Sequence, residues 1–285
     1  MEIFLDCLPC ALKQVLEASR LATDRPELQE NIIEESLKIL KNYKKYRTSP
    51  EIVKDMHQTV KLITGVSDPY KSVKERDIRA AKEIYPFLKE FADNKHGKLY
   101  WALKTSATGN IIDSAIYDTS NFKASLENEL TKKFSSCALD IFTEKLKTSG
   151  NILIIGDNAG ETFFDRILIE HLKGFRITYA VRSEPIINDA TMQDAVDSGL
   201  NECAEIITTG CGAPGAILSQ CGTNFLSVFD KADIVISKGQ GNFEALSDCS
   251  RPLFFLLKAK CPMIAEKLNV DLNDYVFKYQ RTGMI

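Results

Sequence analysis

The stretch NILIIGDNAGETFFD, residues 151–165, decides the fold of this chain. It opens with a mostly apolar run that is typical of a buried strand, and after Ala159 and Gly160 it continues as an amphipathic helix to about Lys173. Parallel α/β sheets place ligand chemistry at such strand-to-helix turns, at the carboxyl ends of their strands. Asp157 and Asn158 therefore offer two oxygen ligands beside free N–H groups, which suits a divalent cation together with a phosphate.

Beyond Gly150 the sequence alternates between apolar strands and helix-sized segments. Helices are expected at 160–173, 190–200, 215–229 and 241–249. The expected strands are 151–156, 176–182, 204–208, 233–237, 252–257 and 275–279. This alternation predicts an α/β fold over residues 149–285, with a Rossmann-like, mostly parallel sheet and helices on both faces.

Residues 1–148 have a different texture. Apolar residues recur at helical spacing, as in Leu12, Val15 and Leu16, and no strand-like run interrupts them. We therefore predict an N-terminal all-helical domain over 1–148. No Gly/Ser-rich linker separates the two parts, so we expect them to pack closely.

Composition excludes several classes of function. The 285 residues are 44% apolar and carry a net charge of −3, and no basic block interleaved with aromatic residues predicts nucleic-acid binding. The beginning MEIFLDCLPC does not resemble a signal peptide, and no run reaches the roughly 18–20 apolar residues of a membrane span. We expect a soluble cytoplasmic protein that binds neither nucleic acid nor a membrane.

The eight cysteines are expected to be reduced thiols. Cys7 and Cys10 form a C-x-x-C, but no second pair completes a zinc site. They lie at an expected helix start, a position that lowers a thiol pKa. A redox pair, an extra metal site and simple packing of the first helix all remain open.

Polar residues also follow the other expected strands. The second strand leads to Arg182 and then to Asn188 and Asp189, and the fourth ends at Lys238 before a glycine turn. The third leads into a Gly/Pro-rich loop at 208–216. Within the helical part, the segment SATGNIIDSAI at 106–116 carries Asn110 and Asp113.

Each of these features has an ordinary structural interpretation. Asn188 and Asp189 could cap a helix, Lys238 could be a surface lysine, and the loop could be only a turn. Their convergence on one sheet edge has no such explanation. Carboxylate and amide oxygens can hold Mg²⁺ or Mn²⁺ while Lys and Arg neutralise a phosphate, which are the main requirements of phosphoryl transfer. The patterns of P-loop and dinucleotide sites are absent from the sequence.

At these motifs the chain resembles the metal-dependent damage-control phosphatases, formerly domain-of-unknown-function family 89, in the short archaeal and bacterial branch with an N-terminal C-x-x-C. Five ordered motifs carry the resemblance over nearly the whole chain: CLPC at 7–10, ATGNIID at 107–113, GDNAGETFFD at 156–165, RSEPIINDAT at 182–191 and SKGQGNFE at 237–244.

The resemblance implies hydrolysis of phosphate monoesters of small metabolites, such as sugar phosphates or damaged metabolites, with Mn²⁺, Mg²⁺, Co²⁺ or Ni²⁺. It implies that Asp157, Asn158 and Asp189 are catalytic metal ligands, and that Lys238 is a catalytic residue that contacts phosphate. The expected substrate-binding residues are Asn110, Asp113, Glu161, Arg182 and Asn188. The loop at 107–113 would close over the site from the helical part.

Two other functions remain as alternatives. One is an S-adenosylmethionine-dependent carboxyl methyltransferase, because a strand that ends in a Gly/Asp turn can also bind that cofactor. The other is a metal or redox sensor without enzymatic activity, built on Cys7 and Cys10. The lysine and the clustered acids favour metal and phosphate over a neutral adenosyl pocket.

Overall fold

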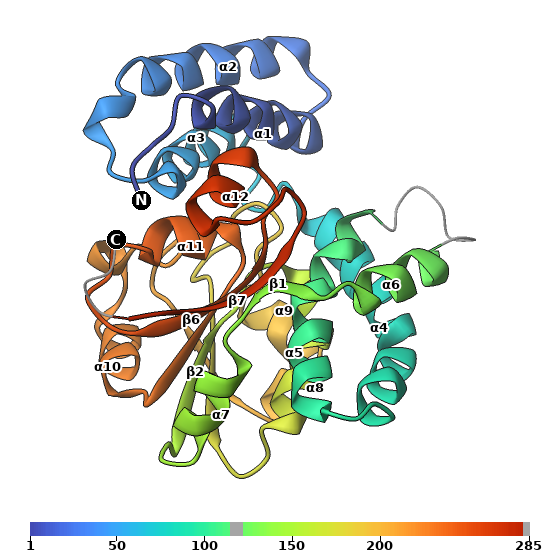
Figure 1. Cartoon of the computed structure of the whole chain (residues 1–285). Helices are drawn as coiled ribbons and strands as arrows, with labels where there is room; N and C mark the ends of the chain where they lie inside the picture. Colours follow the sequence, from blue (N-terminus) through green and yellow to red (C-terminus); the bar gives the residue numbers. More distant parts are fainter. Residues whose placement is uncertain (115–121, 282–285) are drawn as a thin grey trace.

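The computed structural model describes residues 1–114 and 122–281 (Figure 1). Within them the strands are β1 (Phe134–Cys137), β2 (Asn151–Ile155), β3 (Arg176–Val181), β4 (Glu205–Thr208), β5 (Ile234–Lys238), β6 (Leu253–Lys258) and β7 (Tyr275–Gln280). The helices are α1 (Cys7–Ala22), α2 (Pro26–Lys41), α3 (Ser49–Thr64), α4 (Lys71–Asp93), α5 (Lys98–Thr108), α6 (Phe122–Thr131), α7 (Leu139–Leu146), α8 (Thr162–His171), α9 (Met192–Asp197), α10 (Thr223–Lys231), α11 (Gln240–Leu246) and α12 (Pro262–Leu268). Short 3₁₀ turns include η2 (Gly109–Ser114) and η3 (Ala159–Glu161).

The strands form one mixed sheet in the order β1-β7-β6-β5-β2-β3-β4. Strands β6, β5, β2, β3 and β4 are parallel, whereas β7 runs antiparallel to β6 and pairs in parallel with β1. The predicted mostly parallel sheet is thereby confirmed. The chain reverses its direction of strand addition between β2 and β5, and the carboxyl ends of these two strands flank the crevice in which open α/β sheets bind ligands.

Both faces of the sheet are covered, as its apolar strands require. Successive side chains of a strand point to opposite faces. Along β2, Ile152 and Ile154 join a core with α4, α5 and α8, while Leu153 and Ile155 join another with α10, α11 and α12. All four side chains are buried. This two-sided burial explains why the run at 152–155 is apolar without alternation.

The expectation that residues 1–148 contain no strand was wrong. Strand β1 lies there, and its Phe134 packs edge-on against Tyr100 and pairs in register with Tyr275. The strand is only four residues long and has exposed or half-exposed positions after Phe134, so it lacks the apolar pattern by which strands are recognised. Its partner β7 comes almost 140 residues later, and such a pairing leaves no local signal.

The helices of the first half belong to two cores. Residues of α4 and α5, such as Leu88 and Leu103, share a core with the sheet. Helices α1, α2 and α3 have their own core, which includes Val15, Ile32 and Met56. Figure 1 shows these three helices as a layer beside α11 and α12, near the carboxyl ends of the central strands. This layer supplies a wall opposite the strand ends.

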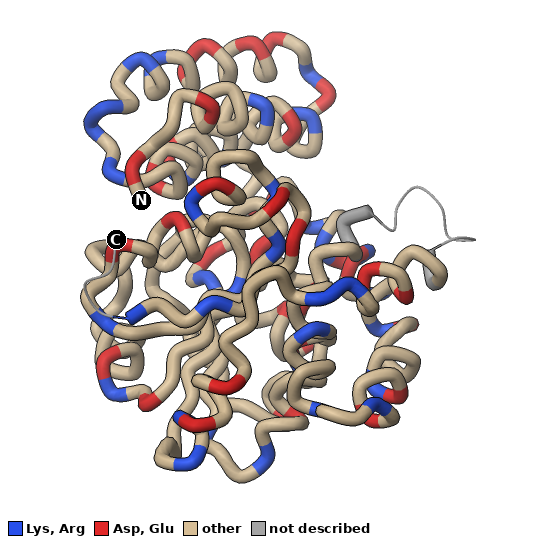
Figure 2. The backbone as a smooth tube through the Cα atoms, in the orientation of Figure 1, with Lys and Arg blue, Asp and Glu red and all other residues tan. Residues whose placement is uncertain are grey.

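Charged residues of both signs are interspersed along the backbone (Figure 2). A few of them connect the layer of α1–α3 to the rest of the protein. The Lys61 ammonium pairs with the Glu184 carboxylate at 3.0 Å, and the Lys54 ammonium donates to the Gln220 side chain at 2.6 Å. Of the helices that the structure describes, none is long and apolar enough to cross a membrane.

Candidate active site

The carboxyl ends of the central strands open into a pocket of about 290 Å³. Its lining comes from the sheet edge on one side and from α1 and α3 on the other. The sequence-predicted residues in the lining are Asn110, Asp157, Asn158, Asn188 and Asp189. The structure therefore brings together the three predicted metal ligands and two of the predicted substrate-binding residues.

Backbone pairing fixes the loops that carry the predicted metal ligands. Asn158 and Asp189 form an isolated antiparallel bridge, in which the Ala159 amide donates to the Asn188 carbonyl and the Ala190 amide donates to the Asp157 carbonyl, each at 2.8 Å. The loop after β2 and the loop after β3 are thus held against each other by main-chain hydrogen bonds. Asp157 and Asp189 are neighbours because of this pairing.

Asp157 is held in a crowded, poorly solvated position. Burial raises the pKa of its carboxyl group to about 7, and the nearby Asp189 carboxylate contributes to this rise. Gly239 passes directly behind it with φ of 78°, and a Cβ atom there would lie 1.9 Å from Asp157 Oδ2. Only glycine permits this approach of the β5 turn to the carboxylate.

The donor set fits a divalent cation. Two neighbouring carboxylates and an amide line one pocket, and burial there leaves the Asp157 carboxylate poorly solvated. Within the same residues, no three His, Cys, Asp or Glu side chains form a metal cage. A cation held here would use the Asn158 amide oxygen as its third protein ligand and take water or substrate oxygens for the others.

Arg182 contacts Asp189. Its Nε donates to Asp189 Oδ2 at 2.6 Å and its Nη1 to Asn242 Oδ1 at 3.1 Å, and the side chain is 1% exposed. Burial alone would lower the pKa of the guanidinium, but Asp189 and Asp157 raise it above its ordinary value. In this arrangement the arginine orients a carboxylate of the pocket.

Lys238 is buried behind the pocket. Its ammonium donates to the Ser106 carbonyl at 3.0 Å, to Glu161 Oε2 at 2.9 Å and to Asp165 Oδ1 at 2.6 Å. These contacts use all three N–H groups of the ammonium. Burial opposes the charge, but the Asp165 and Glu161 carboxylates raise the lysine pKa above its usual value. The predicted contact of Lys238 with phosphate requires one of these bonds to be exchanged.

Glu161 connects this buried group to the pocket. Its Oε2 accepts from Lys238, and its Oε1 accepts from Asn110 Nδ2 at 2.5 Å. Burial raises the pKa of Glu161 to about 8, although Lys238 opposes the shift. Asn110 lines the pocket, and its Oδ1 is buried without a hydrogen-bond partner among the described residues. Asp113 lies in η2, and its side chain is outside the described part of the structure.

Sequence reasoning missed several residues of this region. Asp165 accepts from Ser106, Tyr179 and Lys238, yet in the sequence it reads as an ordinary helix residue. Lys260 lines the pocket directly after β6, and its charge lowers the pKa of Asp157. The rule used for the other strand ends could have found Lys260, because it follows the expected strand 252–257.

Thiols line the opposite side of the pocket. Cys7 and Cys10 of α1 are joined there by Cys261, which lies just before α12. All eight cysteines are free thiols. Burial raises the pKa of both Cys7 and Cys10, contrary to the lowering expected at a helix start, because desolvation outweighs the local hydrogen bonds.

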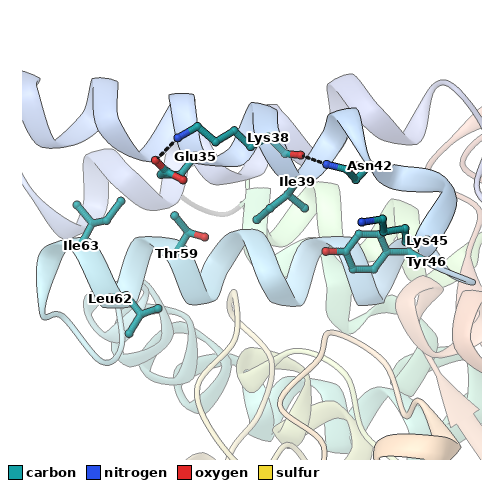
Figure 3. Close-up of a pocket in the computed structure, with 9 residues that line it drawn as sticks. All are labelled: Glu35, Lys38, Ile39, Asn42, Lys45, Tyr46, Thr59, Leu62 and Ile63. Atoms are coloured by element: carbon teal, nitrogen blue, oxygen red, sulfur yellow. Dashed lines mark hydrogen bonds and ion pairs between the residues drawn. The ribbon is translucent and has the colours of Figure 1, made fainter.

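A second cavity, of about 580 Å³, lies between α2 and α3 (Figure 3). Lys38, Tyr46 and Leu62 are among its lining residues. Its Glu35 is neutralised by Lys38 at 2.6 Å, and its lining residues come from α2, α3 and the segment between them. It lacks the paired acids of the first pocket.

Fold and pocket together define an α/β protein with an acid-and-amide site at the switch point of its sheet. Residues 3–276 match the domain described as damage-control phosphatase ARMT1-like, and the chain belongs to this family.

Similar proteins cover nearly the whole chain. A protein named damage-control phosphatase from Archaeoglobus fulgidus is 34% identical over 98% of this chain and 99% of its own length. A second protein so named, from Pyrococcus horikoshii, is 32% identical over 95% of both chains. The crystal structure of a DUF89 family protein from Pyrococcus horikoshii matches with a TM-score of 0.90 and 31% identity, covering 97% of this chain and 98% of that one. The family resemblance drawn from the five motifs is thereby confirmed.

Proposed function

We propose that this protein is a divalent-metal-dependent phosphatase that hydrolyses phosphate monoesters of small metabolites, such as sugar phosphates or damaged metabolites. The observation that carries the proposal is the placement of Asp157 next to the bridged pair of Asn158 and Asp189, in one pocket at the sheet edge. The family and the names of its similar members support the reaction class.

Asp157, Asn158 and Asp189 would hold the cation. A bound Mn²⁺, Mg²⁺, Co²⁺ or Ni²⁺ supplies positive charge for the phosphoryl oxygens. Arg182 keeps Asp189 in place by its 2.6 Å ion pair. The pocket volume of about 290 Å³ lies at the small end of ligand sites and favours a compact substrate.

The positively charged side chain that contacts the phosphate is identified by its exposure in the pocket. Lys238 and Arg182 are both buried, whereas Lys260 is exposed, lines the pocket and acts electrostatically on Asp157. We therefore assign the phosphate contact to Lys260 and the support of Glu161 to Lys238. Asn110 also lines the pocket and would contact the substrate.

The test is release of inorganic phosphate by purified protein from a panel of sugar phosphates and nucleotides, with each of the four ions and with a chelator. The proposal predicts release that depends on the ion and stops with the chelator. No release from any substrate with any ion contradicts it.

The comparisons favour neither alternative function, and both can be tested cheaply. A ligand that binds the folded state raises the melting temperature. We expect Mn²⁺ to raise it and S-adenosylmethionine to leave it unchanged, and the reverse result supports a methyltransferase. A variant with Cys7→Ser and Cys10→Ser should keep its bound cation, whereas a thiol-based metal sensor would lose it.

A further inference from the structure

Asn242 lies at the point where four segments of the site meet. It is fully buried in the first turn of α11, and it belongs to the motif at 237–244 that supplied Lys238. Its Nδ2 donates to the Gly156 carbonyl at 2.9 Å and to the Lys238 carbonyl at 2.7 Å. Its Oδ1 accepts from the Ala216 amide at 2.9 Å and from Arg182 Nη1 at 3.1 Å.

These bonds saturate the side chain, because an amide offers two donors and accepts at two lone pairs. The surroundings also determine its orientation, since two carbonyls face one end and two N–H groups face the other. Lys238 ends β5, Gly156 and Arg182 directly follow β2 and β3, and the fourth partner lies in the segment that leads from β4 to α10. This one side chain therefore connects segments that follow or end four adjacent strands. Structural support of α11 alone would not require contacts with all four.

The contact with Arg182 leads to the candidate metal site. Arg182 Nη1 donates to Asn242 Oδ1, while Nε of the same arginine donates to Asp189 Oδ2 at 2.6 Å. A guanidinium is planar, so fixing Nη1 restricts the direction of Nε. Without Asn242, Arg182 would keep a single carboxylate contact and could rotate about it.

We propose that Asn242 is a positioning residue that sets the geometry of the strand ends and, through Arg182, the direction of the Asp189 carboxylate. Its effect on turnover rests on the proposed phosphatase function. Its effect on Arg182 does not.

The test compares Asn242→Ala with Asn242→Asp. The aspartate retains acceptors for Arg182 and Ala216 but loses both donors, whereas the alanine loses all four bonds. The readouts are hydrogen exchange of the Arg182 Nε–H by NMR, with the signal assigned through Arg182→Lys, and kcat and KM for phosphate release. Ser237→Ala is the matched control, because the Ser237 hydroxyl is buried beside Lys238 without a hydrogen-bond partner among the described residues.

We expect Asn242→Ala to speed Arg182 Nε–H exchange at least tenfold and to lower kcat at least thirtyfold, with KM changed less than threefold. Asn242→Asp should keep the exchange within threefold of wild type, and Ser237→Ala should leave both readouts unchanged. Equal behaviour of the two Asn242 variants overturns the proposal.

If Asn242→Ala does not fold, Asn242→Leu, which also lacks the acceptor for Arg182, takes its place: exchange at least tenfold faster supports the proposal, and exchange within threefold of wild type overturns it. If the wild type releases no phosphate, the proposed function fails, and the exchange rates still decide the role of Asn242.

Discussion

Replacing Gly239 by alanine tests the close approach of the β5 turn to Asp157. The added Cβ would lie 1.9 Å from Asp157 Oδ2, where an ordinary contact begins at 3.4 Å. The carboxylate therefore has to retreat by about 1.5 Å, and a misplacement of about 1 Å can lower an enzymatic rate by about 100-fold. The backbone, at φ 78° and ψ 168°, adds about 1–3 kcal/mol of strain for any residue with a side chain.

Gly97→Ala is the matched control. Its φ is 76°, but nothing lies within 4 Å of the point that a new Cβ would occupy, so the variant carries backbone strain without displacing Asp157. Both variants should lose stability in urea unfolding, and only Gly239→Ala should lose kcat/KM for phosphate release by about 100-fold. Wild-type kcat/KM in the Gly239→Ala protein would contradict this displacement of Asp157, as would an equal loss of activity in the control.

Two further predictions concern buried lysines. Lys104 lies under the Tyr275 ring with its Nζ 2.9 Å from the ring centre, and burial lowers its pKa from the usual 10.5 to about 6. The unfolded chain therefore binds more protons between these two pH values, and this group makes stability rise with pH across that window. Lys104→Met should raise the free energy of unfolding at pH 7 by about 2 kcal/mol relative to wild type, and this gain should shrink toward pH 10. A difference in urea midpoint between variant and wild type that is the same at pH 7 and pH 10 would contradict this. Lys238→Met should cost about 3–5 kcal/mol, because it leaves the Glu161 and Asp165 carboxylates buried without their cation. A Lys238→Met protein with the urea midpoint of wild type argues against the buried cluster.

The sequence predicted the features that depend on local pattern. An apolar run such as β2 can be recognised on its own. Because the carboxyl ends of parallel strands lie at one edge of the sheet, Asp157 and Asp189 are then expected at that edge. That rule does not say how deeply each side chain is buried. Lys238 is predicted to contact phosphate, but the sequence does not show that Ser106 of α5 and Asp165 of α8 accept hydrogen bonds from its ammonium, because these contacts depend on packing between distant parts of the chain.

The same limit applies to β1 and Asn242. Strand β1 forms because Phe134 pairs with β7 and packs against the ring of Tyr100. No short window of sequence contains all three of these partners. Asn242 looks like a polar residue at a helix start until its four partners are placed around it.

The most direct test that this pocket is the active site uses Asp157→Asn, which keeps the shape of the side chain and removes its charge. Mn²⁺ affinity by calorimetry and phosphate release on the best substrate of the panel are compared with wild type. We expect the variant to stay folded, to bind Mn²⁺ at least tenfold more weakly and to lose nearly all phosphate release. Full phosphate release by a folded Asp157→Asn protein would contradict the assignment of this pocket as the active site.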